Sequence, residues 1–167
     1  MTSDDQLGTL LPDGGLRYVR RLAHAPAKVW RALTEGEHLV HWFPADIVGE
    51  RRAGAKLELR FWPAQVERYG ITDPVMSGEL LAWEPTRLFE LTWDRDRLRW
   101  ELEPDGDGTV LTFTTWLADS APESVANTGA GYHVCLDQLR ELMDTGQVAY
   151  LEDGVVRALE KRYAELT

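Results

Sequence analysis

Cysteine is nearly absent from the sequence, since Cys135 is the single one among 167 residues. One cysteine cannot form an internal disulfide and cannot supply the clustered thiolates of a structural zinc site. No apolar run approaches the ~18 residues that a membrane-spanning helix needs. The N-terminal stretch carries Asp4 and Asp5 and has no apolar segment behind a basic one, so we expect no secretory signal. These absences favour a cytoplasmic protein.

Basic residues are scarce, above all in the second part of the chain. The sequence has 18 Lys and Arg against 28 Asp and Glu, a net charge of −10 at pH 7, and residues 101–167 hold 4 of the basic and 13 of the acidic groups. The negative electrostatic potential that this net charge creates repels nucleic-acid phosphates and anionic lipid surfaces. We therefore expect neither nucleic acid nor a membrane as a partner. Solubility alone explains this charge, and an acidic face for a basic partner is the alternative.

Motifs of common catalytic and metal-dependent proteins are missing as well. The sequence has no His-Glu-x-x-His, no Gly-x-Ser-x-Gly elbow and no glycine-rich phosphate loop. We therefore predict no metal, no cofactor and no catalytic residue. Among the four histidines, His41 and His133 can reach an interior cavity, where a neutral imidazole can donate one hydrogen bond to a ligand. A structural or exposed position is the simpler interpretation of both.

Alternating apolar and polar residues predict several strands that are joined by tight turns. In residues 56–61, for example, Leu57, Leu59 and Phe61 share one face. Strands are expected at 8–11, 16–23, 47–48, 56–61, 76–83, 88–93, 98–103 and 109–117, and their short spacing predicts a largely antiparallel meander. Residues 62–75 contain two prolines and a glycine and are expected to form a loop, whose aromatic residues Trp62 and Tyr69 can cover an opening.

Four segments have the periodicity of helices. Two short helices are expected between Pro26 and Phe43, and a long one over 124–143, where apolar residues recur at helical spacing on one face. A last helix over 153–166 has a stripe of four residues, Val156, Leu159, Tyr163 and Leu166. Because so short a helix is marginal alone in water, this stripe must pack on its own domain or on a second subunit, which would make a homodimer.

Several segments, in order, resemble the START/Bet v 1-like helix-grip (SRPBCC) superfamily, in the branch related to the activator of Hsp90 ATPase. They are Arg21–Pro26 with Val29–Thr34, Trp42–Ala45, Gly78–Leu81 with Leu91–Trp93, Gly108–Phe113, and Gly131–His133. The resemblance implies an α+β fold with a curved antiparallel β-sheet around a long C-terminal α-helix, and two short helices after the first long strand. It places a helix-grip domain at 1–146, with a short N-terminal strand, and a helical extension at 147–167.

The aromatic residues are the main candidates for a binding site. The sequence has seven tryptophans, and the expected long helix contains the small residues Gly129 and Gly131. Large rings that pack next to glycine leave space that a helix on a sheet cannot fill. The resemblance implies a cavity there that takes a hydrophobic or amphipathic small molecule; filling of a core is the alternative use of the same rings. The predicted ligand-binding residues are Trp42, Phe43, Phe61, Trp93, Trp100, Gly129, Tyr132 and His133. Arg20 shares a strand face with apolar residues and is a candidate for the interior, where it would need a carboxylate partner.

Three functions fit these observations. The first is non-catalytic binding of a small molecule between the sheet and the long helix. The second, implied by the resemblance, is an enzyme similar to the polyketide cyclases and aromatases of the superfamily. The third is a chaperone partner or stress-response protein similar to the Hsp90 activator, which has an additional N-terminal domain for which this chain has no room.

Overall fold

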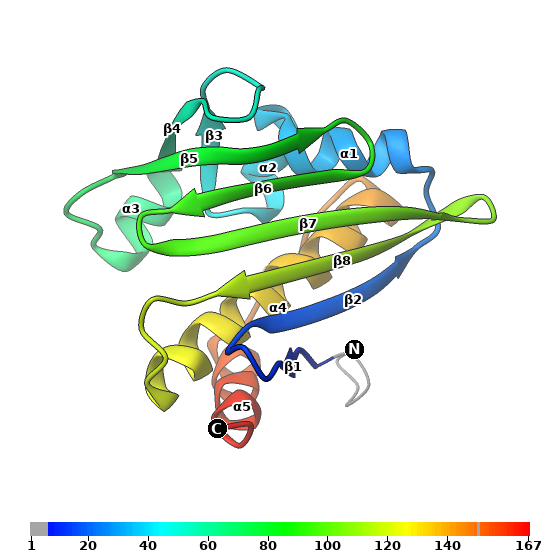
Figure 1. Ribbon diagram of the computed structural model, residues 1–167. Helices are drawn as coiled ribbons and strands as arrows, with labels where there is room; N and C mark the ends of the chain where they lie inside the picture. The colour runs from blue at the N-terminus through cyan, green and yellow to red at the C-terminus, as the bar shows by residue number, and fades with distance from the viewer. Residues whose placement is uncertain (1–6, 150) are drawn as a thin grey trace.

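The computed structural model describes residues 7–149 and 151–167, which contain one eight-stranded antiparallel sheet. The strand order is β1-β2-β8-β7-β6-β5-β4-β3, and the sheet curves around helix α4 (Figure 1). The strands are β1 (Thr9–Leu10), β2 (Leu16–Leu22), β3 (Ala45–Val48), β4 (Lys56–Phe61), β5 (Val75–Glu84), β6 (Leu88–Trp93), β7 (Asp96–Asp105) and β8 (Gly108–Trp116). The helices are α1 (Pro26–Thr34), α2 (Gly36–Trp42), α3 (Pro63–Tyr69), α4 (Pro122–Thr145) and α5 (Asp153–Ala164). The predicted helix-grip architecture is confirmed.

A row of aromatic rings crosses the inner face of the sheet and forms the floor of the core. The register pairs Phe89 with Trp100, Trp100 with Phe113, and Phe113 with Tyr18, so alternation within each strand brings four rings side by side on β6, β7, β8 and β2. Phe89 stacks on Trp100 at 4.7 Å between ring centroids, and Trp100 lies 4.7 Å from Phe113. Such cross-strand aromatic pairs stabilise a sheet beyond the area they bury.

Helices α1 and α2 close one end of the sheet. Pro26 stands in the first turn of α1, where the amide proton that proline lacks would have no partner, and Val29, Trp30 and Leu33 are buried. The indole Nε1 of Trp42, the last residue of α2, donates a hydrogen bond of 2.8 Å to the carbonyl oxygen of Ala32. This bond fixes α2 against α1 and holds the Trp42 ring in the core.

The structure has a helix, α3, within residues 62–75, where the sequence predicted a loop. Pro63 begins the helix, and Gly70 ends it in the left-handed conformation with φ of 60°. Proline at the start and glycine after the end are ordinary helix signals, which the prediction interpreted only as breakers. No residue of α3 is buried. The helix therefore lies over the interior without contributing to the core.

Helices α4 and α5 pack against each other in the same chain. Gly146 ends α4 with φ of 79°, and the chain returns so that Leu159 and Tyr163 of α5 are buried. Leu159 and Tyr163 of the predicted stripe are thus buried within the same chain, and Val156 and Leu166 are partly buried. None of the helices in the described ranges is long and apolar enough to cross a membrane.

Candidate functional site

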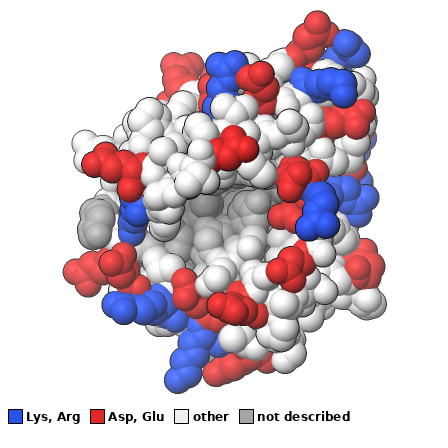
Figure 2. Space-filling model, turned by 90° about the vertical axis from the view of Figure 1, so that its left-hand side faces the viewer, with Lys and Arg blue, Asp and Glu red and all other residues white. Residues whose placement is uncertain are grey.

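A cavity of about 660 Å³ lies between α4 and the sheet, near the end covered by α2 and α3. Figure 2 shows it as a hollow that opens to solvent, with no acidic or basic side chain on the part of its floor seen in that view. Aromatic residues form one wall, α4 forms another, and α3 with the segment that leads into α5 forms the mouth. The lining residues are Val40, His41, Trp42, Phe43, Pro44, Phe61, Gln65, Arg68, Tyr69, Ile71, Trp93, Asn127, Thr128, Gly131, Tyr132, Val134, Cys135, Gln138, Ala149, Leu151 and Val156.

Five of the eight predicted ligand-binding residues meet in the aromatic wall: Trp42, Phe43, Phe61, Trp93 and Tyr132. Trp93 is central, because its ring centroid lies 5.6 Å from that of Phe43 and 5.5 Å from that of Phe61. These rings come from α2 and its end, from β4, from β6 and, for Tyr132, from α4. Several rigid elements therefore hold them, and they present a preformed apolar surface to the cavity.

The wall formed by α4 has a polar residue at each end, Asn127 and Gln138. Asn127, Gly131, Cys135 and Gln138 recur at helical spacing and face the cavity. A Cβ atom added to Gly131 would meet no atom within 4 Å, so this residue faces open space. Among the described residues, the side-chain amides of Asn127 and Gln138 have no hydrogen-bond partner and can serve a ligand.

The thiol of Cys135 and the phenol of Tyr132 are the weakly acidic groups on the same helix that line the cavity. Burial raises the pKa of the Cys135 thiol to about 12, and burial also raises the pKa of Tyr132 above its ordinary value. Both groups therefore stay protonated at neutral pH. The thiol is a poor nucleophile in that state, because the thiolate is the reactive form.

A solvent-exposed ion pair includes Arg68, one of the residues that line the cavity. Nη2 of Arg68, on α3, lies 3.0 Å from Oδ1 of Asp153, the first residue of α5. The Arg68 guanidinium also lies over the Tyr69 ring, 5.4 Å from its centroid. This pair joins the unburied helix α3 to the C-terminal helix.

The three other predicted residues lie outside the cavity. Trp100 is in the aromatic row of the sheet, one layer behind Phe43, at 5.9 Å between centroids. Gly129 faces α5, where an added Cβ would lie 2.8 Å from a ring carbon of Tyr163. His133 is fully buried, with Nδ1 2.7 Å from the Tyr163 hydroxyl. Helix rotation explains the positions of Gly129 and His133, since residues two positions from Gly131 point to other sides of α4.

His133 belongs to a buried polar cluster between β2, α4 and α5. Arg20 is 2 % exposed, which confirms the interior position that the strand pattern indicated. Burial lowers the pKa of its guanidinium, and the carboxylate of Asp137 partly opposes that shift. Asp137 Oδ2 lies 3.4 Å from Nε2 of His133. Burial, with help from Arg20 and Arg162, lowers the pKa of His133 to about 4, so its imidazole is neutral at pH 7.

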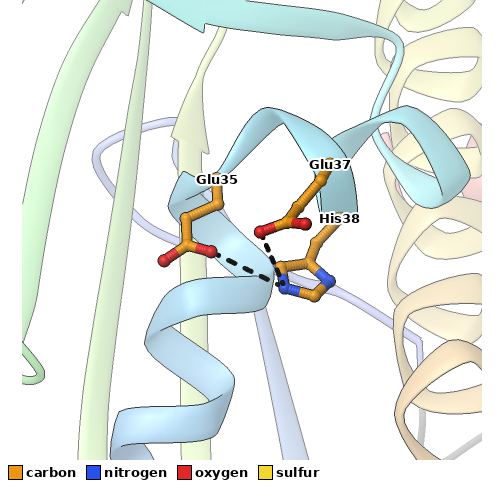
Figure 3. A group of neighbouring side chains, drawn as sticks. All are labelled: Glu35, Glu37 and His38. Carbon is orange, nitrogen blue, oxygen red and sulfur yellow. Dashed lines mark ion pairs between the residues drawn. The ribbon is translucent and has the colours of Figure 1, made fainter.

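A group of acidic residues with one histidine stands at the junction of α1 and α2. Figure 3 shows His38 between Glu35 and Glu37, with Nε2 at 3.7 Å and 4.0 Å from the two carboxylates. Their candidate ligand atoms lie within 4.8 Å of one another. The carboxylate side chains are 44 % and 76 % exposed, as is common in surface ion pairs that hold no metal.

The predicted ligand-binding residues did not include Gly131 or the residues at the mouth. The sequence indicated that Gly129 and Gly131 both leave space beside large rings, but only Gly129, on the apolar stripe, was selected for the site. Gln65 and Arg68 come from α3, which was expected to be a loop, although Tyr69 was expected to cover an opening and does line the cavity. The helix signals at Pro63 and Gly70 could have placed this segment.

A curved sheet that grips a helix, with a cavity between them, defines the class of START/Bet v 1-like (SRPBCC) domains. Within it, a family model described as Activator of Hsp90 ATPase homolog 1-like protein matches residues 23–144. The chain belongs to this family.

Solved structures share the fold. The protein encoded by BPP1335 from Bordetella parapertussis is 24% identical, with a TM-score of 0.74 over 100% of this chain and 96% of that one. CalU16 from Micromonospora echinospora is 20% identical, with a TM-score of 0.69 over 96% and 94%. The Aha1 dimer from Colwellia psychrerythraea is 18% identical, with a TM-score of 0.62 over 79% and 97%. A sequence comparison with curated proteins found no match.

Proposed function

We propose that this protein binds a hydrophobic or amphipathic small molecule in the cavity between the sheet and α4, and does not convert it. The observation that carries the proposal is the cavity of about 660 Å³, which combines five aromatic rings with Gly131 facing open space. Its volume is within the range of small-molecule sites, ~300–1,000 Å³. An apolar ligand that leaves water for this wall gains roughly 25 cal/mol per Å² of buried apolar surface.

The chemistry of the lining favours binding over catalysis. The Cys135 thiol has a pKa of about 12, and no Asp or Glu is among the lining residues that the structure describes. His133 faces the opposite side of α4, so the available general base is the exposed His41 at the rim. A cyclase-like enzyme is the second candidate, because a neighbour of this fold, DynU16, is titled a putative protein in the dynemicin biosynthetic locus.

Association with another copy or with a chaperone stays a separate proposal. The structure from Colwellia psychrerythraea is titled an Aha1 dimer, and the family description names an activator of Hsp90 ATPase. We likewise propose that the protein works in the cytoplasm. Binding to the cavity requires neither partner.

The test uses N-phenyl-1-naphthylamine, an uncharged apolar probe that becomes fluorescent in apolar surroundings. We expect it to bind the natural protein and to quench tryptophan emission. Gly131→Leu should abolish binding because the new side chain enters open cavity space. The matched control is Gly154→Leu, since Gly154 is also helical, exposed and without a close neighbour, but does not line the cavity.

Both substitutions replace glycine in a helix and should leave the fold intact, which circular dichroism checks. Loss of binding in Gly131→Leu together with binding in Gly154→Leu supports the proposal. Unchanged probe affinity in a folded Gly131→Leu variant would place the binding site elsewhere and contradict it.

A further inference from the structure

We infer that the cavity selects uncharged ligands against anions, and that the ion pair between Arg68 and Asp153 sets this preference. The inference rests on the proposed function and names its ligand class: an apolar, aromatic or aliphatic body that carries carbonyl or hydroxyl groups and no acidic group. Three observations lead to it: the pairing of Arg68, the charge around the mouth, and the neutral polar groups on α4.

Arg68 is the one side chain with a permanent charge among the described lining residues. Its guanidinium would normally attract a ligand carboxylate or phosphate. Here Asp153 already lies 3.0 Å away and compensates that charge. An anionic ligand at Arg68 would lie close to the Asp153 carboxylate, which repels it and competes with it for the guanidinium donors.

The electrostatic field around the mouth also disfavours anionic ligands. Figure 2 shows acidic side chains on several sides of the hollow, and the chain has a net charge of −10. Clefts with low-dielectric walls focus such a field, which lowers the local concentration of anions.

The polar groups inside the cavity suit an uncharged molecule. Asn127 and Gln138 are amides, which both donate and accept hydrogen bonds but cannot neutralise a charge. They stand eleven residues apart on α4, roughly 16 Å at the rise of an α-helix. Gly131 lies between them and leaves the centre open. This spacing fits a molecule with polar groups at its ends and an apolar middle against the rings.

The experiment compares two probes with one skeleton: N-phenyl-1-naphthylamine, which is neutral, and 8-anilinonaphthalene-1-sulfonate, which adds a sulfonate. We expect the neutral probe to bind about tenfold more tightly or better. One uncompensated charge interaction near a protein surface changes the binding free energy by enough to account for this difference in affinity. Asp153→Asn should strengthen sulfonate binding several-fold, because it removes the negative charge 3.0 Å from the Arg68 guanidinium, and should leave the neutral probe unchanged. The control is Asp107→Asn, which makes the same charge change in the exposed β7–β8 turn.

Each outcome decides the question. Equal or tighter binding of the sulfonate by the natural protein overturns the inference, and so does an Asp153→Asn variant that behaves like Asp107→Asn. Failure of both probes to bind overturns the proposed function, and this inference with it. Loss of the neutral probe in Gly131→Leu verifies that the measured site is the cavity.

Discussion

The phenolic oxygen of Tyr163 lies 2.7 Å from Nδ1 of His133 and accepts the backbone amide proton of Gly8 at 2.9 Å. The Gly8 amide donates to this oxygen, and a second hydrogen bond joins the same oxygen to the imidazole of His133, whose Nε2 faces Asp137 at 3.4 Å. One side chain of α5 thus satisfies polar groups from the segment before β1 and from α4. The contact fixes α5, whose Val156 lines the cavity.

Tyr163→Phe should destabilise the protein by about 1–3 kcal/mol, the cost of leaving buried polar groups without a hydrogen bond. The Gly8 amide and His133 Nδ1 would both lose their partner, while the ring would still fill its site. Thermal unfolding should show a drop in Tm of several degrees. Tyr69→Phe is the matched control, since Tyr69 is 63 % exposed and should give the natural Tm. Equal Tm values in both variants would contradict the role of this hydroxyl.

His133 should make folding stability depend on pH between about 4 and 6.5. Its pKa is about 4 in the folded protein and near 6.5 when exposed, so the unfolded chain binds more protons across this window. Stability from this residue is complete above pH 6.5 and is lost as the pH falls toward 4, by at most about 1.4 kcal/mol per pH unit.

The neighbours of His133 come from three elements: Arg20 on β2, Asp137 on α4, and Arg162 and Tyr163 on α5. Burial raises the pKa of Asp137, which opposes the effect of His133 at low pH. The measurement is therefore a difference between urea unfolding curves of the natural protein and His133→Gln at pH 5 and pH 7. The variant should lose less stability over this interval; an equal loss in both proteins would refute the assignment.

Gly129 and Gly131 should respond in opposite ways to the same substitution. Gly129→Ala places a methyl group 2.8 Å from the buried ring of Tyr163, and overpacking of this kind costs about 1–3 kcal/mol. Gly131→Ala meets open space and should gain up to about 1 kcal/mol from helix propensity. Urea unfolding measures both. A stabilised Gly129→Ala variant would show that α5 does not pack on α4 as described.

Cys135 should report on cavity occupancy, because it is the single cysteine of the chain and lines the cavity. With a thiol pKa of about 12, it should react with a disulfide reagent at pH 8 at least about a hundredfold more slowly than the same chain unfolded in urea. Saturating N-phenyl-1-naphthylamine should slow the reaction further. Mass spectrometry counts the modified protein, and fast labelling that the probe does not affect would argue against the cavity site.

The sequence by itself determined the elements of this fold and most of the aromatic wall. Alternation in the strands decides which side chains face inward, and five predicted rings, Trp42, Phe43, Phe61, Trp93 and Tyr132, meet in the cavity because each lies on an inward position. Periodicity also selected Arg20 for the interior. These are local properties, since a period of two or 3.6 residues assigns a face without reference to the rest of the molecule.

Only the tertiary structure decided what each inward face meets. Gly129 and Gly131 both lie in α4, yet one contacts Tyr163 and the other faces open space, because α5 covers one side of the helix and not the other. The ion pair of Arg68 with Asp153 joins residues 85 positions apart. Such contacts depend on how helices dock after they form, and docking is set by packing among distant segments, which no local period encodes.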